Sequence, residues 1–248
     1  MKQPNNLSQL LPEPFQWCAI PAGKVTLQYG GSSSNQTFEL PAFYMAQYPI
    51  TNAQFKAFEQ APDGYANPRW WEFAEHAEQW RAKNTEVEST AYIGDMIPRS
   101  NIAWYDAIAF CRWASASLDH KFVVTLPSEQ EWQRAAQGDD NRKYPWGDRF
   151  YATHCNTREG GIGAPTPVTQ FPDGVSPFGV MDMIGNLTEY TATVADVNST
   201  DIKLELPRET RGGSFSMSKD KARNTFRTRL SMNRRSDSHC FRLVCLPK

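Results

Sequence analysis

The chain has 248 residues, a length that suits one large β-rich domain or two small ones. It carries 26 Lys and Arg against 27 Asp and Glu, and 40% of its residues are hydrophobic, which excludes an intrinsically disordered protein. No apolar run approaches the roughly 20 residues of a membrane span, and the first residues lack the apolar segment of a signal peptide, so we expect a cytoplasmic protein without a membrane partner.

Short strands are predicted along the first half of the chain. Residues 1–14 are polar and contain three prolines, so we expect them to be a flexible lead-in to one domain over residues 15–248. The glycine and serine cluster at 30–34 is typical of a hairpin loop. Runs of β-forming residues predict strands at 15–20, 24–29, 37–44 and 122–126.

Helix signals are concentrated between residues 50 and 140. Thr51 and Asn52 are typical of a polar cap before a short helix, and apolar spacing from Asn101 predicts a clearer helix. Ser128 and Glu131 form a capping-box pattern. After about residue 140 glycine and proline become frequent and no amphipathic pattern is present. We therefore predict two helices and a loop-rich C-terminal half.

The charge is distributed unevenly. Residues 201–248 hold 12 Lys and Arg against 5 Asp and Glu, a net +7, and the first 200 residues hold 14 against 22, a net −8. Clustered basic residues are typical of nucleic-acid-binding proteins. The sequence contains no recognised nucleic-acid-binding module, so we favour a protein or other macromolecular ligand.

The cysteines give no support for zinc, thioredoxin-type or disulfide-framework chemistry. They are odd in number, form no Cys-x-x-Cys pair and are scattered along the chain: Cys18, Cys111, Cys155, Cys240 and Cys245.

Five motifs occur in the order of one known family. They are YPITNAQF at 48–55, IAWYDAIAFCRW at 102–113, LPSEQEW at 126–132 with YPWG at 144–147, DMIGNLTEY at 182–190, and RGGSF at 211–215 closing on FRLV at 241–244. Together they resemble the formylglycine-generating-enzyme (sulfatase-modifying factor) family over residues 15–246. The resemblance implies an α+β, C-type-lectin-like fold with two helices, a small twisted antiparallel sheet and large irregular loops. The four tryptophans of these motifs are expected in its core: Trp104, Trp113, Trp132 and Trp146.

The catalytic residues of the family's oxidases are missing. Those enzymes bind copper(I) and the substrate thiol through two cysteines after the Arg-Gly-Gly-Ser motif, because soft thiolates suit copper(I). Residues 216–223 contain no cysteine here, and Cys240 stands where the family usually has glycine. We therefore expect neither an enzyme nor a copper cofactor, and keep a copper-dependent formylglycine-generating-type oxidase as the alternative.

A second branch of the family joins this domain to an iron-binding four-helix domain and makes sulfur–carbon bonds at a His-rich site. The histidines here are widely separated, and we interpret them as surface or hydrogen-bonded structural residues: His76, His120, His154 and His239.

A third branch is non-catalytic and resembles this chain best. Its members are variable proteins diversified by diversity-generating retroelements, whose variable region begins with Arg-Gly-Gly-Ser-aromatic and ends in Gly-Phe-Arg-Val/Leu-Val. Residues 216–240 occupy that region. The resemblance implies that this segment binds a ligand, and an ordinary solvated basic loop is the alternative.

Ligand contacts are expected from the side chains of this segment. Phe226 and Arg229 are of the types that form binding hot spots. The full set of expected contacts is Ser216, Met217, Ser218, Lys221, Phe226, Thr228, Arg229, Leu230, Ser231, Arg234, Ser236, Asp237 and Ser238.

The arginines of the tail divide into two groups. Those that match framework positions of the family are expected to be buried and paired: Arg211, Arg223, Arg227 and Arg242. The remaining basic residues are expected to shape an acidic or mixed ligand site: Lys219, Lys221, Arg229, Arg234 and Arg235.

One calcium site is also implied by the resemblance. Asp182, Gly185, Leu187 and Glu189 match the stretch that holds a structural calcium ion in the family, and oxygen donors suit that ion. A buried, hydrogen-bonded structural role for Glu189 is the alternative.

Overall fold

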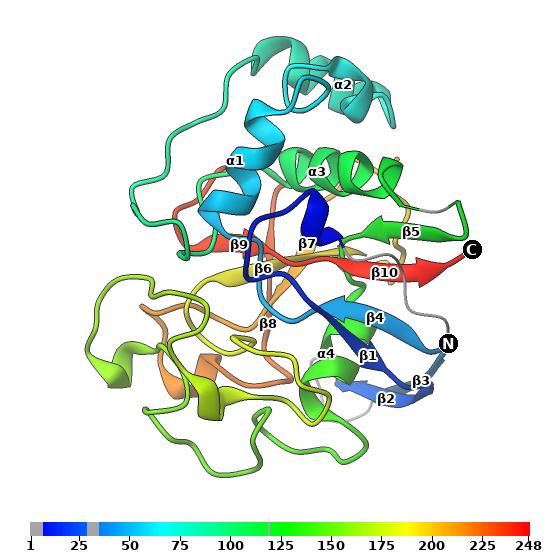
Figure 1. Ribbon diagram of the computed structural model, residues 1–248. Coiled ribbons are helices and arrows are strands. Elements are labelled where there is room, and N and C mark those ends of the chain that lie inside the picture. The colour runs from blue at the N-terminus through cyan, green and yellow to red at the C-terminus, as the bar shows by residue number, and fades with distance from the viewer. Residues whose placement is uncertain (1–6, 29–34, 119) are drawn as a thin grey trace.

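The described part of the chain, residues 7–28, 35–118 and 120–248 of a computed structural model, contains ten strands and four α-helices (Figure 1). The strands are β1 (Trp17–Ile20), β2 (Gly23–Gln28), β3 (Asn35–Leu40), β4 (Phe43–Ala46), β5 (Phe122–Thr125), β6 (Thr188–Val194), β7 (Arg208–Arg211), β8 (Arg227–Leu230), β9 (His239–Phe241) and β10 (Val244–Pro247). The helices are α1 (Asn52–Gln60), α2 (Glu75–Lys83), α3 (Trp104–Ala116) and α4 (Glu129–Gln137).

Two four-stranded sheets are joined through the end of the chain. One sheet has the order β1-β4-β10-β5 and the other β8-β7-β6-β9, while β2 and β3 pair with each other. Because β9 and β10 follow one another closely, the segment at Arg242 passes from one sheet to the next. The strand pairs are antiparallel except β6 with β9, which is parallel and so departs from the predicted antiparallel sheet.

The α+β class is confirmed, but the described residues contain four α-helices where we predicted two. The helix α1 is capped by Thr51, and the predicted capping box before α4 is present, with Glu131 N–H donating to Ser128 Oγ at 3.1 Å. The helix α2 escaped prediction because it buries only Ala77 and Arg81 and so shows no apolar stripe. After residue 140 the helical segments are three short 3₁₀ turns, as expected of a loop-rich half.

Two predicted boundaries are corrected. Residues 7–14 are not loose: Leu7 and Leu11 are buried, and the Gln54 side chain donates to the carbonyl of Pro14 at 2.7 Å. Residues 1–6 lie outside the described part. The strand predicted at 37–44 is divided between β3 and β4 at Pro41, which has no N–H to donate to a ladder.

The core surrounds α3 and α4. Trp104, Trp113 and Trp132 are buried as predicted, while Trp146 is partly exposed. In Figure 1, α1, α2 and α3 lie on one side of the molecule, and the long loops of residues 140–185 and 212–226 gather away from them. No helix of the described chain is long and apolar enough to cross a membrane.

Candidate functional site: the C-terminal face

Residues 216–240, here called the C-terminal face, connect β7 to β9 and contribute the edge strand β8. The chain turns out of β7 at Gly212, whose φ of +90° and position against the Met183 carbonyl leave no room for a side chain: an added Cβ would lie 2.6 Å from that oxygen. This turn directs the segment away from the sheet and onto the surface.

None of the thirteen predicted contact residues is buried. The exposed ones are Ser216, Lys221, Arg229, Ser231, Arg234 and Asp237, and the partly exposed ones are Met217, Ser218, Phe226, Thr228, Leu230, Ser236 and Ser238. Between them lie buried residues that tie the segment to the core: Ala222, Asn224, Met232, His239 and Cys240. The face is therefore a set of surface side chains on an anchored backbone. Whether they contact a ligand stays a prediction.

Framework hydrogen bonds hold this backbone in place. Asn224 donates its N–H to Lys143 O and its side-chain amide to Arg142 O, both at 3.0 Å. The Trp104 N–H at the start of α3 donates to Met232 O at 3.0 Å. Each anchor comes from outside the face, so the surface side chains do not determine the path of the chain.

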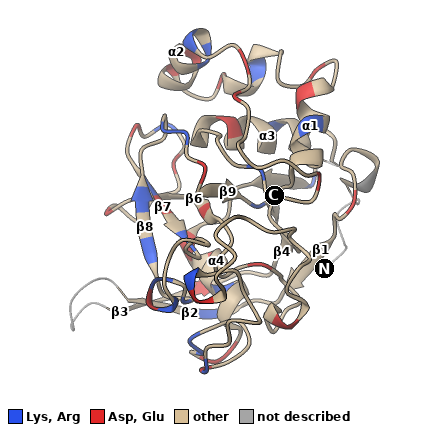
Figure 2. Cartoon of the chain, turned by 90° about the vertical axis from the view of Figure 1, so that its left-hand side faces the viewer, with Lys and Arg blue, Asp and Glu red and all other residues tan. Residues whose placement is uncertain are grey.

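The arginines divide largely as expected, with two corrections. Arg223, predicted to be buried and paired, is only partly buried and forms no ion pair with the described residues. Arg211 and Arg242 are fully buried, and Arg227 is partly buried with its guanidinium 3.2 Å from Glu129. Arg235 is not a free charge of the face, because its side chain is only 16% exposed, forms an ion pair with Glu88 at 3.1 Å and lies over Trp80. Arg229 is exposed but pairs with Asp196. Figure 2 shows the basic residues of β8 at the outer edge of its sheet.

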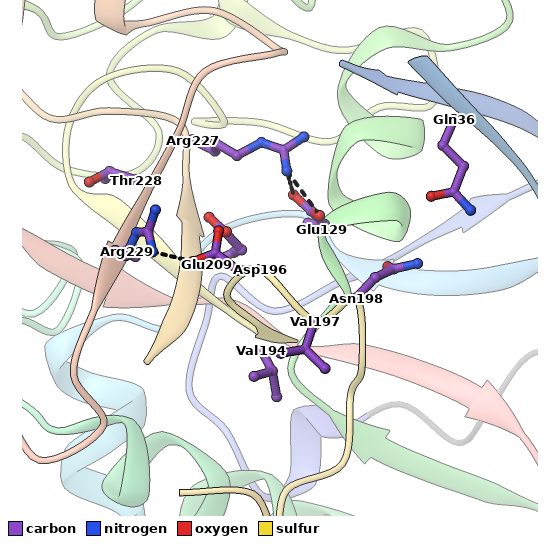
Figure 3. Close-up of a pocket in the computed structure, with 10 residues that line it drawn as sticks. All are labelled: Gln36, Glu129, Val194, Asp196, Val197, Asn198, Glu209, Arg227, Thr228 and Arg229. Atoms are coloured by element: carbon purple, nitrogen blue, oxygen red, sulfur yellow. Dashed lines mark hydrogen bonds and ion pairs between the residues drawn. The ribbon is translucent and has the colours of Figure 1, made fainter. Parts of the chain in front are cut away.

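A pocket of about 660 Å³ lies beside this strand (Figure 3). Its walls come from distant parts of the chain: the start of α4, the turn after β6, and the strands β3, β7 and β8. Three carboxylates and two guanidiniums line it, namely Glu129, Asp196, Glu209, Arg227 and Arg229. The prediction from sequence included Arg229 and Thr228 but missed the three acids, because only tertiary contacts bring them to β8.

Of the four predicted calcium residues, Asp182 and Glu189 contact the buried Arg242, whereas the Gly185 N–H donates to Gly212 O and Leu187 O accepts from Cys240 Sγ. The two Glu189 oxygens accept from Arg242 Nε and Nη2 at 2.6 Å each, and Trp132 Nε1 donates to Glu189 at 2.9 Å. The Asp182 carboxylate accepts from Asn186 at 2.8 Å, and its pKa is raised well above the usual range by burial. As placed, Glu189 does not fit a calcium ligand, since a guanidinium already neutralises it. Calcium binding stays a prediction that a titration would test.

The five cysteines are buried and none pairs in a disulfide. Burial raises the pKa of Cys18 to about 11 and of Cys155 to about 12, so these thiols carry little thiolate at neutral pH. Within the described ranges, no three His, Cys, Asp or Glu side chains are grouped so as to hold a metal ion.

Buried His239 lies at the end of the face. Its Nδ1 is 3.0 Å from Ser236 Oγ and 3.1 Å from Ser238 Oγ. Burial, with a smaller contribution from Arg234, lowers the pKa of His239 to about 4. The imidazole is therefore neutral at physiological pH and positions the two serines.

Together the two sheets, the helices and the long anchored loops define an α+β protein of the C-type-lectin-like, formylglycine-generating-enzyme type. Comparison with known proteins identifies the family: the sulfatase-modifying factor enzyme 1-like domain matches residues 9–246, and the chain belongs to that family.

Its curated relatives include enzymes and an inactive homologue. The chain is 29% identical over 172 residues to hercynine oxygenase of Mycolicibacterium thermoresistibile, a match that covers 62% of this chain and 36% of the relative. It is 27% identical over 228 residues to formylglycine-generating enzyme of Bos taurus, covering 72% of this chain and 58% of the relative. It is 30% identical over 118 residues to inactive C-alpha-formylglycine-generating enzyme 2 of the same species, covering 43% and 36%. The chain thus spans between about a third and three fifths of the length of these relatives.

Solved structures agree on the fold. Treponema denticola variable protein 1 superimposes with a TM-score of 0.68 at 21% identity, covering 94% of this chain and 95% of that one. PvdO from Pseudomonas aeruginosa gives a TM-score of 0.69 at 18% identity, covering 92% and 93%. At these identities the likeness is one of fold.

Proposed function

We propose that this protein is a non-catalytic ligand-binding protein, diversified by a retroelement, that binds a protein or other macromolecule through the C-terminal face. One observation carries the proposal: none of the thirteen predicted contact residues is buried, while five residues interspersed among them or directly following them are buried and anchor the segment, namely Ala222, Asn224, Met232, His239 and Cys240. A preorganised backbone of this kind binds with little ordering cost.

The same arrangement suits a diversified surface. The backbone is held by Arg142 and Lys143 carbonyls and by the N–H of Trp104, all outside the face. Exchange of surface side chains therefore removes none of these bonds, and the fold tolerates many sequences at the face.

The oxidase alternative lacks support in the chemistry of the thiols. Copper(I) and a substrate thiol need accessible thiolates, whereas all five cysteines are buried and residues 216–223 contain none. Because the relatives include a hercynine oxygenase and formylglycine-generating enzymes, oxidase activity is tested directly. Copper(I) titration of the whole chain, with an assay on a Cys-containing sulfatase-motif peptide, should give no stoichiometric binding and no turnover. Turnover would refute the proposal.

Diversification is tested in the genome and in the protein. A reverse transcriptase gene and a near-copy of the coding region for the face, differing only at adenines, should lie beside this gene, and absence of both would refute diversification. A library varied at the thirteen contact positions should retain folded members at a high rate, whereas a matched library at buried positions of β6 should not. Equal loss of folded members in the two libraries would contradict a display surface.

A further inference from the structure

The pocket beside the C-terminal face is lined by three carboxylates, and the ion pairs of the neighbouring arginines involve only two of them. Glu129 pairs with Arg227 at 3.2 Å and with Arg211 at 3.5 Å. Asp196 pairs with Arg229. Figure 3 shows both arginines of β8 turned toward these two acids. The third carboxylate of the pocket, Glu209, is left over.

Glu209 is a buried residue, 5% exposed, whose backbone carbonyl accepts from Thr191 Oγ1 at 2.8 Å. Its carboxylate lines the pocket, and none of the residues that the structure describes makes a hydrogen bond or ion pair with it. On the sheet it lies directly opposite Arg229, a position in which an ion pair would be expected, yet that guanidinium binds Asp196 instead. Burial raises the pKa of Glu209, and Glu129 raises it further, while Arg227, Arg211 and Arg229 oppose the rise.

A carboxylate in such a place is stabilised either by a proton or by a cation brought to it, and the pocket gives a cation access to Glu209. Two carboxylate oxygens match the planar fork of a guanidinium, and an ammonium can also bind them. The pocket is large enough for a long side chain, and half-exposed Val197 offers an apolar wall for the aliphatic stem of such a residue.

We propose that Glu209 anchors a site for one guanidinium or ammonium group, carried by an Arg or Lys side chain of the protein ligand. This inference rests on the proposed function, because Thr228 and Arg229 belong both to the C-terminal face and to the pocket. The sequence predicts a ligand that is acidic or carries both charges, and this inference specifies that the ligand carries a basic residue that binds beside β8.

The test uses the whole chain and blocked amino acids as probes. N-acetyl-arginine methylamide, its neutral citrulline analogue and spermidine are titrated while NMR follows the backbone amides of β7 and β8 and the Glu209 carboxyl carbon. The arginine probe should shift these signals and lower the pKa of Glu209, and the citrulline probe should bind about tenfold more weakly or less. Glu209→Gln, which keeps the shape of the side chain, should abolish the difference between the two probes.

Controls separate the possible outcomes. Asp237→Asn removes an exposed acid of the face outside the pocket and should leave arginine binding unchanged. Equal responses to arginine and citrulline, no response to either, or binding unaffected by Glu209→Gln would each overturn the site. Tighter binding of spermidine than of arginine would assign the pocket to a free amine and overturn the side-chain source. None of these results alters the genomic and copper tests, so failure of this site is distinguishable from failure of the proposed function.

Discussion

The buried ion pair between Glu189 and Arg242 should be the strongest single electrostatic determinant of stability. Arg242 donates to Glu189 twice at 2.6 Å, to Met181 O at 3.0 Å and to Gln47 O at 3.2 Å. It therefore connects β6, the loop before it and the end of β4 at the junction of the two sheets. Both side chains are fully buried.

Arg242→Met keeps much of the volume but leaves the Glu189 carboxylate buried without a cation. Loss of one partner of such a pair costs about 3–5 kcal/mol. At about 2–4 °C per kcal/mol for a chain of this length, the melting temperature should fall by about 6–20 °C. Urea unfolding followed by tryptophan fluorescence measures the free energy directly.

The double variant tests the cause of that loss. Glu189→Gln with Arg242→Met removes the uncompensated charge while leaving an oxygen to accept from Trp132, so the double variant should be more stable than Arg242→Met alone. Arg234→Met, at an exposed arginine, is the control and should change stability by less than about 0.5 kcal/mol. If Arg242→Met costs less than about 1 kcal/mol, or if the two substitutions add, the pair does not hold the junction.

Three further outcomes follow from burial. The pKa of Glu209 is raised in the folded state, so the folded protein holds this proton more tightly than the unfolded chain, and stability falls as pH rises above the ordinary glutamate value. Glu209→Gln should flatten this slope in urea titrations between about pH 4 and 8 and should make the protein more stable at neutral pH. An unchanged slope in the variant would contradict this reasoning. The pKa of His239 is lowered to about 4, so as pH falls the unfolded chain takes up this proton before the folded protein does. Stability should therefore fall below the ordinary histidine pKa, by at most about 1.4 kcal/mol per pH unit. His239→Gln should remove this dependence in thermal melts at several pH values, and the same dependence in the variant would refute the reasoning. A triple alanine variant at Ser231, Arg234 and Asp237, all exposed, should melt within about 2 °C of the wild type in calorimetry, and a larger loss would show that the face supports the fold.

The helix caps and the buried arginines could be predicted from the sequence, because each depends on residues close together in the chain or on a family motif. The capping box at Ser128 depends on residues three apart, and it forms as predicted. The burial of Arg211 and Arg242 followed from their places in family motifs. The surface position of the thirteen predicted contact residues followed in the same way.

Features that depend on distant partners escaped prediction. Glu129 and Arg227, which pair across the pocket, are 98 residues apart in the chain. Arg235 was expected to be free, but Glu88 from the segment before α3 reaches it. No local pattern reports such contacts, since they depend on how α4 and the loops pack against β8.

The basic tail therefore has two physical roles, and β8 contains both. Arg227 forms part of the framework through Glu129, whereas Arg229 is exposed and its pairing with Asp196 is worth little in water. Exchange of Arg229 for a neutral residue would release Asp196 and leave the pocket with two uncompensated carboxylates beside the buried Glu129 pair. The charge of the pocket is thus set at a position within the C-terminal face, while Glu209 and Glu129 stay fixed on β7 and α4. Variation at one surface residue could in this way change the affinity for a basic ligand group without disturbing the buried ion pairs that hold the fold.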